Sequence, residues 1–334
     1  MRILALVVKR VFWFFPTILG LLVLTFVISH IIPADPVAFA AGEMASHEQI
    51  EALRKKFGYD KPLYVQLYRY ILAVMQGDLG VSLYTERSIS EDLFRLLPAT
   101  IELTLVSIFL TTVFGIPLGV ISALKRNSLF DHGLRVLTVS GLAVASFWLA
   151  IQLQLLFAME LDVLPLHGRI DGWGPETVTG FFLIDSLIAG DMDAFVSSVK
   201  HLVLPALTLS IPAAATVVRF TRAGVLNAIN SNYVFYEVAM GFPRSVIVWK
   251  YVLRNALVGT VAQIGLIFGI LLAGAVVVEA VFDWPGLGFY AVQSILLSDY
   301  NAIMGFTLLT GTMFVIVNLL TDITHDLIDP RASK

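Results

Sequence analysis

The sequence predicts an all-α integral membrane protein with six transmembrane helices. Of its 334 residues, 57% are hydrophobic and only 14% are charged, whereas about 25% of the residues of a soluble domain are charged. The mean hydropathy of +0.84 points the same way. The apolar residues gather in long runs that polar and basic stretches separate, which is typical of membrane-spanning helices.

The first apolar run, residues 11–32, follows Lys9 and Arg10 and is long enough to cross the ~30 Å hydrocarbon core as a helix. A cleavable signal peptide is the competing interpretation, because Ala38–Phe39–Ala40 resembles a cleavage site. The run is longer than the ~7–15 residues of a signal sequence, so we expect a retained helix within residues 1–32. The other five spans are expected at 99–124, 136–157, 202–220, 256–282 and 303–321.

The one sizeable polar insert, residues 33–98, separates this first helix from a core of five helices in residues 99–330. It begins with IIPADP, whose prolines stop the helix. A charged helix from Ser46 to Phe57 and a GDLG turn at 77–80 are expected to follow. The later segment 160–200 is acidic and irregular, and its apolar piece is too short to cross a membrane.

The basic residues are distributed unevenly along the chain. They concentrate before the first span, between the second and third spans, and in residues 219–254. Acidic residues dominate the alternate connections. Since cytoplasmic loops are enriched in Lys and Arg, we expect both termini in the cytoplasm and the insert 33–98 outside.

Residues 232–257 (NYVFYEVAMGFPRSVIVWKYVLRNAL), which we call the elbow, form a polar and basic island between two apolar spans. Gly241 can adopt the positive φ that ends a helix, and Pro243 suits the first turn of the next helix. We therefore expect two short helices around Gly241, with an exposed aromatic and methionine tip that a partner covers. Packing on the bilayer surface is the rival interpretation. The expected docking residues are Tyr233, Tyr236, Glu237, Ala239, Met240, Gly241, Phe242, Arg244, Arg254 and Asn255.

Arg219 and Arg222 lie three residues apart, just before the elbow, and so share one helix face. They can anchor the cytoplasmic end of the fourth span, or they can brace the elbow. The sequence leaves both roles open.

The elbow resembles the cytoplasmic coupling loop of ATP-binding-cassette (ABC) importer permeases of the peptide branch. The resemblance rests on Tyr233-Val234, Ala239, Gly241 and the run 254–257 (RNAL), whereas Tyr251 and Gly259 depart from the usual His and Pro. Other segments extend the resemblance to dipeptide permease B-type proteins over essentially the whole chain. These segments are IIPADP, LRKKFGYDKPLYVQLYRY, GDLGVSL, DWPGLG and NLLTDITHDLIDPR.

The resemblance implies the type I importer permease fold and one membrane-spanning subunit of an ATP-driven importer for di- and oligopeptides. The implied partners are a second homologous permease in a heterodimer, two ATP-binding subunits, an extracytoplasmic solute-binding protein and the lipid bilayer, but no nucleic acid. The implied location is a bacterial or archaeal inner membrane. The sequence has no Walker A motif. We therefore expect no catalysis, cofactor or metal in this chain, and ATP and Mg²⁺ at the partner subunits. Nickel complexes, glutathione, opines and saccharides remain alternative solutes.

An ion-coupled carrier or a channel would share this composition. Such a carrier usually has an ionisable residue at the membrane midplane, whereas Glu102, Glu279 and Asp322 all lie near the ends of predicted spans. We interpret these three, together with His30 and His201, as interfacial residues. On that interpretation a Glu102→Gln substitution is mild.

Overall fold

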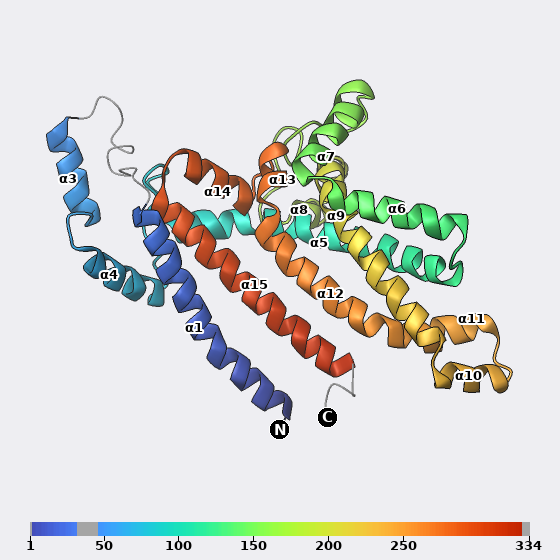
Figure 1. Ribbon diagram of the computed structural model, residues 1–334. Helices are drawn as coiled ribbons and strands as arrows, with labels where there is room; N and C mark the ends of the chain where they lie inside the picture. Colours follow the sequence, from blue (N-terminus) through green and yellow to red (C-terminus); the bar gives the residue numbers. More distant parts are fainter. Residues whose placement is uncertain (1, 32–45, 329–334) are drawn as a thin grey trace.

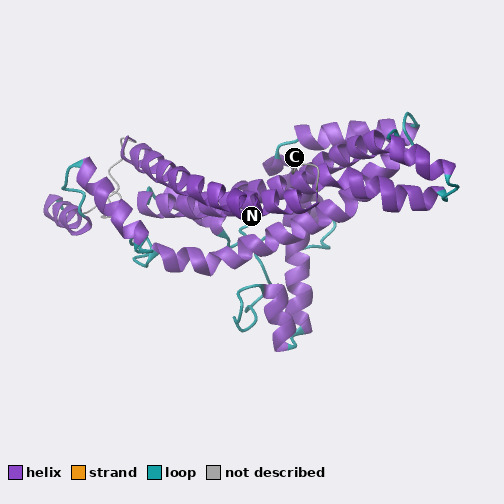
Figure 2. Cartoon of the chain, turned by 90° about the horizontal axis from the view of Figure 1, so that it is seen from below, coloured by secondary structure: helices purple, strands orange, loops and turns teal. Residues whose placement is uncertain are grey.

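The computed structural model describes residues 2–31 and 46–328, and within these ranges every regular element is a helix (Figure 1). The long helices lie side by side in the order α1, α15, α12 and α9, and α5 packs along α9. From below, the long helices form an elongated layer from which a smaller group projects (Figure 2). The bounds are α1 Arg2–Ile31, α3 His47–Phe57, α4 Leu63–Met75, α5 Ile89–Leu124, α6 Leu129–Ala143, α7 Ser146–Leu153, η1 Gln154–Glu160, α8 Phe182–Ala189, α9 Met192–Ile229, α10 Asn232–Ala239, α11 Arg244–Val246, η2 Ile247–Val252, α12 Leu253–Gly274, α13 Val276–Val281, α14 Leu287–Leu296 and α15 Tyr300–Ile328.

Among the described residues, four helical segments are long and apolar enough to cross a membrane, and the bent pair α6 and α7–η1 makes five if it counts as one span. The first predicted span corresponds to α1. Among the described side chains, its apolar stretch covers residues 12–28 and is shorter than the four segments. The four segments are Ile89–Leu124, Met192–Ile229, Arg244–Ala273 and Tyr300–Thr324.

The third predicted span, 136–157, is not one continuous helix. α6 and the segment α7–η1 meet at an angle of 104°. Val144 and Ala145 at the bend are extended, with ψ of 127° and 133°. No proline or glycine stands at these two positions, so the bend depends on tertiary packing: α6 lies along α9, and α7 contacts α9 and α13.

The polar insert contains the helix that the sequence predicts after Ser46. Ser46 accepts a hydrogen bond from the backbone of Gln49, and the Gln49 side chain accepts one in return, which forms a capping box. The GDLG turn is also confirmed, with φ of 81° at Gly77 and 88° at Gly80. α5 begins at Ile89, before the predicted start of the second span at 99. Residues 32–45, which hold most of IIPADP and the candidate cleavage site, lie outside the described ranges.

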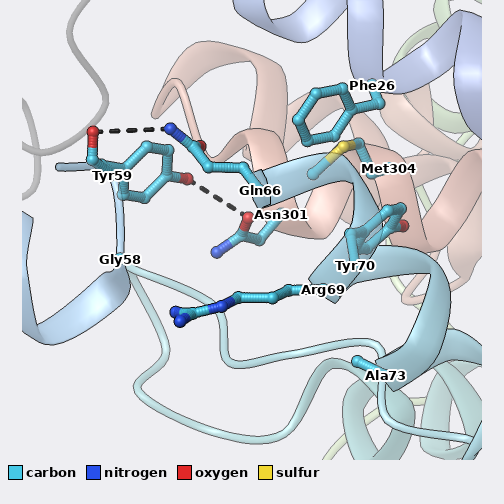
Figure 3. A pocket seen from close by; sticks show the side chains of 9 residues that line it. All are labelled: Phe26, Gly58, Tyr59, Gln66, Arg69, Tyr70, Ala73, Asn301 and Met304. Carbon is cyan, nitrogen blue, oxygen red and sulfur yellow. Dashed lines mark hydrogen bonds between the residues drawn. The ribbon is translucent and has the colours of Figure 1, made fainter. Parts of the chain in front are cut away.

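α4 and the turn that follows α3 border a cavity of about 210 Å³ beside α1 and α15 (Figure 3). Tyr59 Oη donates a hydrogen bond to Asn301 Oδ1 at 3.2 Å, and the rings of Tyr70 and Phe26 stack with centroids 6.3 Å apart. These contacts join the polar insert to the first and last long helices.

Close helix approaches explain several of the glycines. At Gly224 of α9 an added Cβ would lie 2.6 Å from the carbonyl oxygen of Ala256 in α12. Small residues allow such contact between membrane helices, where van der Waals packing drives association. α9 and α12 therefore meet closely beside the elbow that connects them.

Candidate functional site

The elbow has the two-helix form that the sequence predicts. α10 ends at Ala239, and Gly241 has a φ of 79°. The Gly241 N–H donates to Val238 O at 3.0 Å, and the Phe242 N–H donates to Glu237 O at 3.3 Å. Pro243 precedes α11 as its N-cap and so lies one position before the first turn in which we expected it. Gly241 therefore adopts the left-handed conformation that glycine favours and forms the turn between the two helices of the elbow.

One side of the elbow is buried and the other is exposed. Val234 and Ile247 are buried against Val120 of α5 and Val225 of α9. Of the predicted docking residues, Tyr233 and Glu237 are half-buried, and the Asn255 side-chain amide donates to Tyr251 O at 2.9 Å. The exposed ones are Tyr236, Ala239, Met240, Gly241, Phe242, Arg244, Arg254 and Asn255.

The exposed side is apolar and aromatic. Tyr236 and Met240 are 64% and 61% exposed, and the Phe242 ring lies 6.0 Å from the ring of Tyr251. The neighbouring Phe235 and Val238, which the sequence did not single out, are similarly exposed. Such a patch at the end of a helical hairpin is suited to bind a groove on another protein.

Arg222 makes a two-pronged ion pair with Asp131 at the start of α6. Its Nε lies 2.7 Å from Asp131 Oδ1 and its Nη2 lies 2.9 Å from Oδ2. Asp131 is fully buried and also accepts hydrogen bonds from Ser122 Oγ at 2.6 Å and Asn127 N at 3.0 Å. The pair therefore fastens α9 to the turn between α5 and α6. The Arg222 hydrogen bonds described here go to Asp131 and not to the elbow.

Arg219, the other candidate for bracing, is exposed and lies against the ring of Phe220. Bracing of the elbow by Arg219 or Arg222 stays a prediction. The sequence reasoning missed Asp131, although a single acid after the basic pair Lys125-Arg126 was the available signal.

At the opposite end of α5, Ala99, Thr100 and Glu102 form a set of contacts that we call the α5 hub. The Ala99 carbonyl accepts a hydrogen bond from Trp284 Nε1 at 3.0 Å. Thr100 Oγ1 donates to Glu279 Oε1 at 2.7 Å and accepts from Leu287 N at 2.8 Å. One turn of α5 thus holds α13, the buried Trp284 and the start of α14.

Glu102 completes the α5 hub through Arg169. Arg169 Nη2 lies 2.5 Å from Glu102 Oε2, and the guanidinium stacks 3.8 Å from the centre of the Phe182 ring. The backbone N–H of Leu183 donates to Glu102 Oε1 at 2.9 Å. The Glu102–Arg169 pair is therefore enclosed by aromatic and backbone groups.

The interpretation of Glu102 and Glu279 as interfacial anchors is wrong. Glu102 is 4% exposed and Glu279 is 0% exposed. Gly288 N donates to Glu279 Oε2 at 2.6 Å, so this carboxyl caps the turn that leads into α14. His201 is likewise 5% exposed, and its Nδ1 lies 2.8 Å from Ser197 O. Asp322 is half-buried, and the side chain of His30 lies outside the described ones.

Asp185 in α8 fixes the loop that carries Gly180. Its carboxylate accepts hydrogen bonds from Thr179 N at 2.8 Å, Thr179 Oγ1 at 2.7 Å and Gly180 N at 2.9 Å. Burial acts to raise the pKa of Asp185, but these hydrogen bonds outweigh it, so the pKa lies below the usual value. The ionised carboxylate holds the loop in place, and the Gly180 carbonyl accepts from Arg169 at 2.8 Å.

The structure reverses the expected effect of Glu102→Gln. An amide cannot balance the buried Arg169 charge, and removing one partner of a buried ion pair costs about 3–5 kcal/mol. We expect a marked loss of thermal stability and of uptake, measured on the purified assembly and in whole cells. Glu51→Gln is the matched control, because the Glu51 side chain is 47% exposed and its Oε1 lies 3.8 Å from Arg54 Nε; such a surface pair contributes only about 0–1 kcal/mol. Equal effects of the two substitutions would contradict this account.

Together, the long apolar helices and the exposed elbow at their end define a membrane-spanning helical protein with a loop suited to bind a partner. Among the described residues no group of three or more His, Cys, Asp or Glu side chains could hold a metal ion. The chain belongs to the family of binding-protein-dependent transport system inner membrane components, whose model matches residues 115–334. The N-terminal model of the same system matches residues 3–104.

The relatives extend over nearly the whole chain. The probable D,D-dipeptide transport system permease protein DdpB of Escherichia coli K12 is 42% identical over 94% of this chain and 93% of its own length. The di/tripeptide transport system permease protein DppB of Pseudomonas aeruginosa is 38% identical over 98% of each chain. The resemblance to peptide-type ABC importer permeases that the sequence indicated is thereby confirmed.

A solved structure supports the fold. The chain is similar to a chain of the inward-facing MetNI methionine ABC transporter, with a TM-score of 0.52 over 72% of this chain and 96% of that chain. The sequence identity is 21%, so this likeness concerns the fold alone. It confirms the type I importer permease fold.

Proposed function

We propose that this inner-membrane permease carries di- and oligopeptides and forms the translocation path with a second, homologous permease. The observation that carries the proposal is the near full-length similarity to permeases named for dipeptides, at 36–42% identity. A glutathione transport system permease protein of Pectobacterium atrosepticum is also 36% identical, so glutathione is the second candidate solute.

The elbow provides the connection to ATP hydrolysis. α9 leads into α10, and η2 leads into α12, so a pull on the elbow acts on two long helices at once. In this proposal two ATP-binding subunits grip the exposed side that Tyr236, Met240 and Phe242 line. Their closure on ATP tilts α9 and α12 and opens the path to the other side. ATP and Mg²⁺ are used by those subunits, and this chain binds no cofactor.

The bent segment α6–α7 supports a second permease as partner. Val136, Leu137 and Val139 on α6 and Phe147 and Trp148 on α7 are each at least half exposed. A 104° bend between two apolar helices forms an arm that another membrane subunit can pack against. In this proposal the partner is a homologous permease, so the pair is a heterodimer.

The arrangement of the ends supports cytoplasmic termini. The start of α1 and the end of α15 lie at the same end of the bundle as α10 and α11, and α3, α13 and α14 lie towards the other end (Figure 1). In this proposal the elbow end faces the cytoplasm of a bacterium or archaeon. The solute-binding protein then docks at the opposite end.

Affinity purification in mild detergent from the native cell tests the assembly. We expect two ATP-binding subunits and a second permease to co-purify with this chain. Recovery of the chain alone in several detergents would favour the carrier or channel alternative. Uptake of labelled dialanine, compared with glutathione, in cells with and without the chain then tests the solute.

A further inference from the structure

A cavity of about 340 Å³ lies where α7 and η1 meet the end of α13, at the end of the bundle away from the elbow (Figure 1). Its volume and its mostly apolar walls with a few convergent polar groups are those of a small-molecule site. The apolar walls are Ile151, Leu155, Met159, Leu166 and Val281, and the polar groups are Gln154, His167 and Asp283.

Gln154 is held in place by two hydrogen bonds. Its side-chain Nε2 donates to Leu166 O at 2.9 Å and to Val281 O at 3.1 Å. These bonds engage both amide hydrogens and leave Oε1 as an acceptor. Gly168 N donates to Phe282 O at 2.8 Å, so the segments that carry His167 and Asp283 are fastened to each other.

Asp283 adopts an unusual backbone conformation at the mouth of this cavity. Its φ is 47°, in the left-handed region that few non-glycine residues occupy. The adjoining Trp284 is fully buried. Its backbone N–H donates a hydrogen bond to Glu279 O at 2.8 Å, and this bond fixes the turn. The Asp283 side chain is exposed, and within the described ranges no ion pair involves it. A carboxylate is thus held at the edge of an apolar cavity by a rigid turn.

The polar groups of the cavity share one chemistry: they are hydrogen-bond acceptors. Asp283 contributes a carboxylate, Gln154 an amide oxygen and His167, when neutral, one ring nitrogen. No Lys or Arg lines the cavity, and the nearby Arg169 is paired with Glu102. A positively charged group with three N–H donors, a primary ammonium, matches this set.

We propose that this cavity binds the protonated amino terminus of the transported peptide, with Asp283 as its ionic partner. Gln154 and His167 accept the remaining N–H groups, and Leu155 and Met159 contact the first side chain. The inference rests on the proposed peptide substrate and adds which end of the peptide this permease recognises.

The cysteine-free sequence provides a direct test in the assembled complex. A Met159→Cys variant places a single thiol of this chain in the cavity, and its labelling by a maleimide is followed on the separated subunit. Dialanine is expected to slow the labelling, whereas N-acetyl-dialanine, which lacks the ammonium, is not. In the same background, Asp283→Asn should raise the dialanine concentration needed for half-maximal protection by at least about tenfold, the effect of losing one charged hydrogen bond.

Trp173→Cys is the matched control, because Trp173 is 98% exposed and outside the cavity. Its labelling should not respond to either peptide. If Asp283→Asn does not assemble, His167→Ala gives the same comparison, since His167 is also exposed. Three outcomes would each overturn the inference. Both peptides could protect equally, or both thiols could be protected. The Met159→Cys thiol could also stay unreactive without peptide because a partner subunit covers it.

Dialanine uptake by the same complex without the added thiol distinguishes failure of the amino-terminus site from failure of the proposed peptide substrate. Uptake without protection at Met159→Cys overturns only the amino-terminus site. Absence of uptake overturns the proposed peptide substrate, and the inference with it.

Discussion

Replacing Arg222 with alanine is expected to destabilise the assembled permease by about 3–5 kcal/mol, the cost of leaving a buried charge without its partner. The Asp131 carboxylate is fully buried and would keep the hydroxyl of Ser122, the N–H of Asn127 and the exposed guanidinium of Arg135, whose Nη2 lies 3.6 Å from Oδ2. Thermal unfolding of the purified complex and the amount of the chain in the membrane measure the effect. We expect both to fall.

Arg219→Ala is the matched control for this substitution. Arg219 lies one helical turn away on α9 but is exposed, so its loss should change stability little. The double variant Arg222→Met with Asp131→Asn should cost less than the sum of the two single changes, since neither charge is then left alone. Additive costs would show that the two side chains are not coupled.

Replacing Gly241 with valine is expected to abolish uptake while the complex still assembles. A β-branched residue resists the φ of 79° found at Gly241, and such backbone strain costs about 1–3 kcal/mol. A Cβ at this position meets no atom within 4 Å, so the effect comes from the backbone and not from a clash. Uptake and ATP hydrolysis by the assembled complex are measured together, and we expect hydrolysis to persist without transport.

A graded series isolates the conformational cause. Gly241→Asn should retain more uptake than Gly241→Ala, and Gly241→Val the least, because asparagine tolerates the left-handed region best of the three. Gly259→Val is the control: Gly259 also has open space around it but lies within α12 without a positive φ. Normal uptake by Gly241→Val would refute the role of the Gly241 turn in transport.

The features that the sequence predicted correctly are local ones. The positive φ at Gly241, the cap at Ser46 and the GDLG turn each depend on the conformational preference of one or two residues. The apolar runs likewise identify α5, α9, α12 and α15, because crossing a bilayer requires about 20 apolar residues whatever the neighbouring helices are.

The features that the sequence did not reveal depend on distant partners. Glu102 and Glu279 lie near span ends and so resemble interfacial anchors, but Arg169 and Thr100 bury them inside the protein. No proline or glycine at Val144 or Ala145 signals the bend after α6. The bend results from the packing of α6 and α7 on other helices. The residues that contact these positions lie far away in the chain, so the local sequence does not predict the burial or the bend.

The α5 hub has a consequence for biosynthesis. The ribosome delivers α5 to the membrane before Arg169 and long before Glu279 and Trp284 exist, yet these later residues satisfy Glu102, Thr100 and the carbonyl of Ala99. Glu102 therefore has no counter-ion until Arg169 has been synthesised, and the contacts of Thr100 and of the Ala99 carbonyl form only after Glu279 and Trp284 have been inserted. A chain that stops before α13 can form the Glu102–Arg169 pair but lacks Glu279 and Trp284, so the hub is completed only late in synthesis.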